Sequence, residues 1–131
     1  MKAFKLIILS VIATLFCLDI NAQQDKETIE TACLMKTTSE WASDCGQCLN
    51  DDNTYRINLQ NICEKAIDVR LAVQENTLRW KIFNFTEIPA GEEVSGYACI
   101  GTGRYVFWTR DANDPSVIFP SDREIELQFN R

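Results

Sequence analysis

Residues 55–82 read YRINLQNICEKAIDVRLAVQENTLRWKI, and the fold follows from this stretch. Apolar side chains alternate with polar ones over 55–62, again over 67–74 and once more over 78–82. An alternation with a period of two is typical of a β-strand that buries one face and exposes the other. Polar residues interrupt the alternation at 64–66 and 75–77. The stretch therefore predicts three consecutive strands separated by turns.

The same pattern continues to the C-terminus. Four further short segments have the composition of strands: 94–100, 105–109, 117–119 and 124–129. Turn-forming residues separate them: Pro89-Ala90-Gly91, Gly101-Thr102-Gly103, Asn113-Asp114-Pro115 and Pro120-Ser121-Asp122. The Gly-Thr-Gly turn is expected to form a hairpin in which the glycines take positive φ. About seven short strands without helix patterns between them predict an all-β fold, a single antiparallel β-sandwich over residues 54–131. A small barrel is the alternative.

Residues 23–53 differ from this domain, because they are polar and carry three cysteines. Ile29, Ala32, Cys33 and Lys36 recur at helical spacing, which predicts a helix over 25–36. The polar turn at 50–53 marks the boundary with the domain that follows. We expect a cysteine-rich, partly helical segment packed across the sandwich.

The first 22 residues have the pattern of a secretory signal peptide. Two lysines precede an apolar run over 6–18, and small Ala22 stands before the expected cleavage site. The run is shorter than the roughly 20 residues that a membrane anchor needs. Lipid attachment at Cys17 is disfavoured, since bulky Phe16 precedes it. We expect cleavage after Ala22 and a secreted or periplasmic mature chain without a membrane span.

The mature chain, residues 23–131, is long enough for one domain. Without the signal peptide its net charge changes from −6 to about −7, because two lysines and one aspartate are removed. An acidic chain lacks the basic patches that nucleic acid requires, so nucleic acid is not an expected partner. The chain has no histidine, which excludes Ser-His-Asp and Cys-His catalysis. We expect no cofactor.

Cysteine usage agrees with an oxidising compartment. The mature chain has five cysteines: Cys33, Cys45, Cys48, Cys63 and Cys99. Cys63 and Cys99 both belong to the strand region, where neighbouring strands can meet the Cα separation of about 4.4–6.8 Å that a disulfide requires. We therefore predict a Cys63–Cys99 bridge and leave the pairing of the other three open. Four of the thiols would also suit zinc, but their spacing is irregular and an oxidising compartment favours bridges.

Two motifs offer alternative chemistry. Cys45-Gly46-Gln47-Cys48 has the spacing of thiol–disulfide oxidoreductases, although neither a strand before it nor a helix after it is predicted. Glu92-Glu93 and the Asp111/Asp114 cluster would supply paired acids for a carboxylate-based hydrolase. In both cases a structural use of these residues, as bridges or solvated turns, is the simpler interpretation.

Aromatic residues give the stronger indication of binding. Tyr105 and Phe107 share one face of a predicted strand, while Trp108 lies on the other, and Arg104 and Arg110 flank them. Aromatic rings beside arginines suit recognition of a protein or a glycan. We therefore expect an exported, non-catalytic binding module whose partner is a protein or a glycan.

Overall fold

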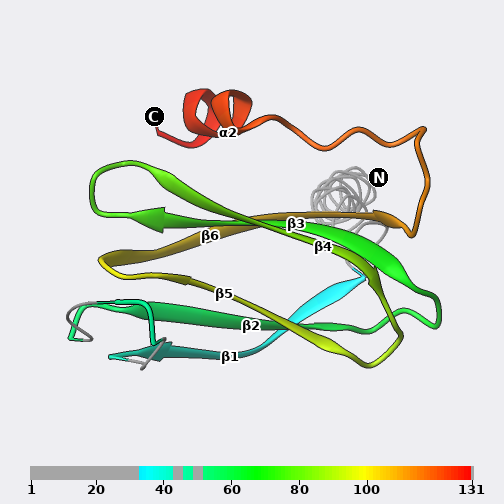
Figure 1. Cartoon of the computed structure of the whole chain (residues 1–131), viewed down its shortest axis with the longest axis horizontal. Helices are drawn as coiled ribbons and strands as arrows, with labels where there is room; N and C mark the ends of the chain where they lie inside the picture. The colour runs from blue at the N-terminus through cyan, green and yellow to red at the C-terminus, as the bar shows by residue number, and fades with distance from the viewer. Residues whose placement is uncertain (1–32, 43–45, 49–51, 131) are drawn as a thin grey trace, which may run out of the picture. The chain divides into compact units, whose positions relative to one another are not determined.

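The computed structural model describes residues 33–42, 46–48 and 52–130. Within this part the elements are β1 (Leu34–Trp41), β2 (Tyr55–Asn61), β3 (Ile67–Glu75), β4 (Trp80–Ile88), β5 (Glu93–Ala98), β6 (Gly101–Asp111) and the helix α2 (Asp122–Phe129). The strands form two antiparallel sheets, sheet A in the order β1-β2-β5 and sheet B in the order β4-β3-β6. Figure 1 shows the two sheets stacked, with α2 above sheet B. The described chain is mostly β, and its sheets pair in the manner of a sandwich.

The core lies between the sheets, where the period-two alternation directs apolar side chains. In β2 every second residue is buried, beginning with Tyr55, and in β5 the buried residues are Val94, Gly96 and Ala98. Strand β3 is buried on both faces, because it is the central strand of sheet B and α2 covers its outer side. Burial of β3 on both faces explains its apolar Leu71-Ala72-Val73 run.

The sheets approach closely where β5 crosses β3. A Cβ added to Gly96 would lie 2.5 Å from Cδ2 of Leu71, which is nearer than real side chains come. Glycine at this position therefore permits the close contact between β5 and the core side of sheet B.

A second apolar cluster lies on the outer face of sheet B. Ala72, Trp80 and Ile125 are buried there, and Val106, Trp108 and Phe129 pack around them. Ile125 and Phe129 are four residues apart, so both lie on the helix face that meets the sheet. Helix α2 covers this cluster.

The sequence prediction of a strand over 124–129 is wrong, because these residues belong to α2. Ser121 and Glu124 form a capping box: the Ser121 hydroxyl accepts from the Glu124 amide, and the Glu124 carboxylate accepts from the Ser121 amide. This arrangement satisfies backbone donors that a helix start leaves open and selects the helix. The predicted strand over 117–119 is also absent from the structure, where these residues form no regular element.

Strand β1 replaces part of the predicted helix over 25–36. Residues 34–36 are extended and pair with β2, Leu34 opposite Asn61. Residues 25–32 lie outside the described residues, as do the predicted signal peptide over 1–22 and Cys45. No helix within the described ranges is long and apolar enough to span a membrane.

The disulfides are Cys33–Cys63 and Cys48–Cys99, with Cα separations of 5.0 and 5.3 Å. The predicted Cys63–Cys99 bridge is therefore wrong. Cys33 immediately precedes β1 and Cys63 follows β2, so the antiparallel pairing of these strands brings the two cysteines together. The second bridge ties the connection between β1 and β2 to the end of β5.

The Gly-Thr-Gly segment also differs from expectation. Gly103 has φ +84°, as a glycine turn predicts, but β5 and β6 belong to different sheets and do not form a hairpin. Gly101 is instead needed for a close approach, since a Cβ there would lie 2.4 Å from Cβ of Tyr55. The segment carries the chain from sheet A to sheet B.

Candidate functional site

The aromatic residues proposed for recognition are divided between two faces of β6. Tyr105 and Phe107 are half-buried and pack against the core between the sheets. Trp108 lies on the opposite face, where its ring meets Phe129 of α2 edge-on at a centroid distance of 6.0 Å. The three rings therefore do not form one surface.

The two arginines of the same proposal hold the C-terminal segment in place. Arg104 donates to the Phe129 carbonyl at 3.1 Å and lies over the Trp80 ring. Arg110 donates through Nε to Asp68 at 3.0 Å and through Nη1 to the Val117 carbonyl at 2.8 Å. A recognition role for Arg104, Tyr105, Phe107, Trp108 and Arg110 stays a prediction.

The carboxylates proposed for hydrolysis have structural partners or face solvent. Asp111 forms an ion pair with Lys65 at 2.6 Å. Asp114 accepts hydrogen bonds from the hydroxyl and amide of Ser116, and these lower its pKa below the ordinary value. A general acid needs a raised pKa, so the shift is opposite to that role. Glu92 and Glu93 are exposed at the start of β5.

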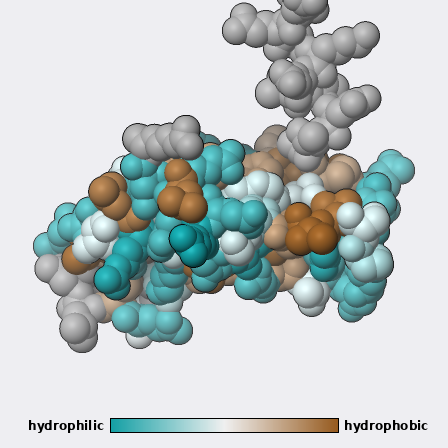
Figure 2. Space-filling view, turned by 90° about the horizontal axis from the view of Figure 1, so that it is seen from above, coloured by the Kyte–Doolittle hydropathy of each residue, from teal (hydrophilic) through white to brown (hydrophobic). Residues whose placement is uncertain are grey.

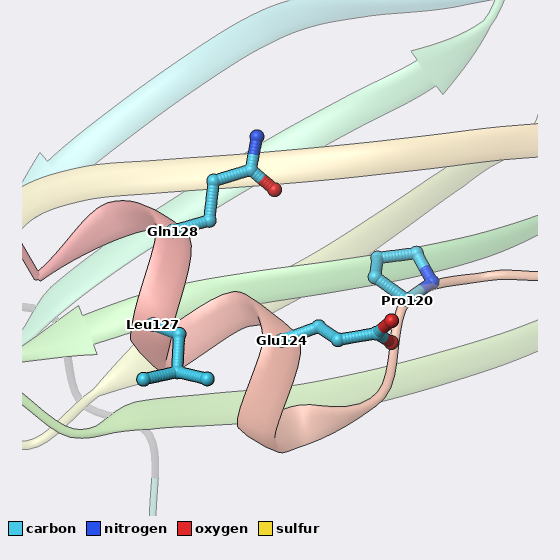
Figure 3. Close-up of a pocket in the computed structure, with 4 residues that line it drawn as sticks. All are labelled: Pro120, Glu124, Leu127 and Gln128. Atoms are coloured by element: carbon cyan, nitrogen blue, oxygen red, sulfur yellow. The ribbon is translucent and has the colours of Figure 1, made fainter.

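The C-terminal helix borders an open hollow of about 370 Å³, lined by Pro120, Glu124, Leu127 and Gln128 (Figure 3). The Glu124 carboxylate is held by the Ser121 amide and hydroxyl, which lower its pKa. Figure 2 shows this side of the molecule with separate hydrophobic patches among hydrophilic side chains. Among the four lining residues only Glu124 carries a charge, and its carboxylate already caps the helix.

The Cys-x-x-Cys motif is not closed on itself, because Cys48 is bonded to Cys99. Among the described residues, no three of His, Cys, Asp or Glu are grouped so that they would hold a metal ion.

The outward side of sheet A carries an ordered set of polar side chains. We call it the sheet A face and define it by the outward residues Thr38 and Glu40 of β1, Arg56 and Asn58 of β2, and Ser95 and Tyr97 of β5. The pairing of the strands places them in two rows, Glu40–Arg56–Tyr97 and Thr38–Asn58–Ser95.

Hydrogen bonds link these side chains across all three strands. Asn58 donates from its amide to the Thr38 hydroxyl at 2.6 Å, and its carbonyl oxygen accepts from the Ser95 hydroxyl. Arg56 donates to the same Ser95 hydroxyl at 3.4 Å. These hydrogen bonds restrict the rotamers of the linked side chains. The linked side chains are exposed or half-buried, so solvent reaches this row of donors and acceptors.

An aromatic corner adjoins the β5 edge of this face. The Tyr97 ring lies 5.5 Å from the ring of Phe83, which comes from β4 of the other sheet. Phe85 stacks beside Phe83 with a centroid distance of 6.5 Å. Nζ of Lys81 lies 3.7 Å from the Tyr97 ring centroid, and the Tyr97 hydroxyl bonds to Gln47. Rings, one ammonium group and the polar rows therefore meet along β5.

The sequence prediction missed this site. Arg56 and Asn58 are polar residues of the alternating segment 55–62, and every half-buried strand has such a polar side. The information that was lacking is the register that places Tyr97 opposite Arg56 and the packing that brings Lys81 over its ring.

No protein-family model matches this chain, and comparisons with curated proteins and with solved structures give no match either.

Proposed function

We propose that the chain is an exported, non-catalytic binding module that recognises a glycan on the sheet A face. The observation that carries this proposal is the hydrogen-bonded row Thr38–Asn58–Ser95, which crosses three strands and presents hydroxyl and amide groups to solvent. The outer side of the other sheet is covered by α2 and serves the stability of the chain. The signal-peptide pattern of residues 1–22 supports export.

The composition of the face favours a glycan over a protein partner. Hydroxyl, amide and guanidinium groups can donate to or accept from the many hydroxyls of a sugar, and Tyr97 adds a ring with a polar tip. Protein interfaces usually centre on apolar or aromatic anchors within a patch depleted of charge. The two rows of the sheet A face instead contain two charged side chains, Glu40 and Arg56, and a single aromatic ring, Tyr97.

A printed array of neutral, amino-bearing and acidic glycans tests the proposal with the fluorescently labelled mature chain. We expect retention of a restricted set of glycans, and loss of that retention in Asn58→Ala, which removes the centre of the row. Thr86→Ala is the matched control, because Thr86 is an exposed strand residue of the other sheet. No retained glycan, or equal loss in both variants, would overturn the proposal.

A further inference from the structure

We infer that the corner formed by Arg56, Lys81 and Tyr97 is a subsite for a carboxylate-bearing sugar, such as a uronic acid unit. The inference rests on the proposed function and adds the chemical class of the ligand. Its basis is that Lys81 lies over the Tyr97 ring and that a second cation, Arg56, is the strand partner of Tyr97, in a chain whose net charge is −6.

Lys81 supplies the first cation. Its Nζ lies 3.7 Å from the Tyr97 ring centroid and 5.8 Å from that of Phe83. The ion pairs in the described part of the chain join Lys65, Arg70 and Arg110 to aspartates, so no carboxylate of a described residue pairs with Lys81, which lies over the rings. A cation over an aromatic ring keeps N–H donors for a ligand.

Arg56 supplies the second cation, directly opposite Tyr97 in the pairing of β2 with β5. On the β1 side, Glu40 is paired with Arg56, but among the described residues no ion pair within 4 Å joins Glu40 to Arg56. The guanidinium instead donates to Ser95 on β5, so it is directed towards the Tyr97 side of the face. A guanidinium can bind a carboxylate through two parallel N–H donors.

These features together select an anionic sugar. A neutral sugar would use the hydroxyl and amide row but would bring no charge to either cation. A carboxylate next to Tyr97 would accept charge-assisted hydrogen bonds from Arg56 and Lys81, which are stronger than bonds between neutral groups. The hydroxyls of the same sugar would then reach Ser95 and Asn58, which lie in the adjoining row.

Titration calorimetry of the mature chain tests the subsite with tetragalacturonate and with its fully methyl-esterified form, which has the same sugars without the charges. We expect the free acid to bind at least about tenfold more tightly, the size of effect that one or two charge-assisted hydrogen bonds produce. Lys81→Gln should weaken the acid about tenfold and leave the ester unchanged. Arg56→Gln should also weaken the ester, because Arg56 belongs to the sheet A face, but should weaken the acid about tenfold more. Lys81→Arg should retain most of the affinity.

Arg123→Gln is the matched control. It removes one exposed cation from α2, so it changes the net charge by the same amount as Lys81→Gln but away from the sheet A face. Equal weakening in this control, or equal affinity for acid and ester, overturns the subsite. If array glycans bind at the sheet A face but tetragalacturonate does not, the inference fails and the proposed function stands. If the array also shows no binding, both the proposed function and the subsite inference fail. Thermal unfolding of each variant shows whether a loss of binding is due to a loss of fold.

Discussion

The buried carboxylate of Asp68 accepts a hydrogen bond from Nε of Arg110 at 3.0 Å, which joins β3 to β6. The same carboxylate accepts from the backbone amides of Glu87 on β4 and Asn113 beyond β6. One side chain that is 2% exposed therefore connects all three strands of sheet B and the start of the C-terminal segment.

Replacing Asp68 with Asn removes the charge and keeps the size of the side chain. We expect the free energy of unfolding to fall by about 2–4 kcal/mol, because Arg110 loses its counter-ion and at least one backbone amide loses a charged acceptor. Urea denaturation measures the change. Asp122→Asn is the control: its carboxylate pairs with Arg70 but is 72% exposed, so a loss below about 1 kcal/mol is expected. Equal losses would contradict the special role of Asp68.

The pKa of Asp68 predicts how stability depends on pH. Burial alone would raise this pKa, but hydrogen bonds from Glu87, Arg110 and Asn113 outweigh burial and lower it. A carboxyl with a lower pKa in the folded state stabilises the fold above its unfolded pKa of about 3.9, and the stabilisation is lost as pH falls through the folded pKa. We expect the free energy of unfolding to drop below about pH 4, and to drop less steeply in Asp68→Asn. Parallel curves for the two proteins would refute this assignment.

The disulfide pairing gives a third prediction. Non-reducing peptide mapping should find Cys33 with Cys63 and Cys48 with Cys99. The bridges join residues 30 and 51 positions apart, and by the chain-entropy model each should contribute about 3–4 kcal/mol. Replacing either pair with serines should lower the free energy of unfolding, measured by urea denaturation, by a similar amount. Recovery of a Cys63–Cys99 peptide from the folded protein would contradict the structure.

The presence of β2 to β6 was predictable because their side chains alternate and polar or turn-forming residues separate them. The predicted segments 78–82 and 105–109 cover only parts of β4 (Trp80–Ile88) and β6 (Gly101–Asp111). Strand β1 was not predictable, since seven of its eight residues are exposed or half-buried and its pairing with β2 shifts register between Lys36 and Thr38. Residues 124–129 alternate like a strand, yet Ser121 and Glu124 already had the spacing of a capping box. In that segment the cap, and not the alternation, determined the structure.

The candidate site was beyond prediction for a different reason. Arg56, Lys81 and Tyr97 come from three strands in two sheets, and their proximity depends on register and sheet packing. Alternation identifies which residues of one strand share a face, but it does not say which strand lies beside which. The order β1-β2-β5 and β4-β3-β6 supplies that information.

Ile125 is the fully buried side chain of helix α2 in its contact with sheet B. Ile125 is fully buried, so Ile125→Ala should lower the free energy of unfolding by about 2–4 kcal/mol. Leu127→Ala is the control, because Leu127 is 64% exposed and a change within about 0.5 kcal/mol is expected. Tryptophan fluorescence should shift to the red in Ile125→Ala, since Phe129 of α2 contacts the rings of Trp80 and Trp108. An unchanged spectrum and stability would show that the helix does not hold the aromatic face.

Gly101 allows the chain to pass from sheet A to sheet B against Tyr55. An alanine there would place its Cβ 2.4 Å from the Tyr55 Cβ and 3.3 Å from the Tyr55 amide nitrogen. Neither atom can rotate away, because both are fixed by the backbone of β2. The φ of Gly101 is not positive, so the predicted cost is steric alone.

We expect Gly101→Ala to lower the free energy of unfolding by about 3 kcal/mol, at the upper end of overpacking. Gly96→Ala should cost less, about 1–2 kcal/mol, because the nearest atom is the end of the Leu71 side chain at 2.5 Å, which can change rotamer. Thr86→Ala, at an exposed strand position, should stay within about 0.5 kcal/mol and serves as the control. Urea denaturation of the three variants gives the order directly. A larger loss for Gly96→Ala than for Gly101→Ala would mean that the core around Leu71 is less adaptable than the backbone around Tyr55.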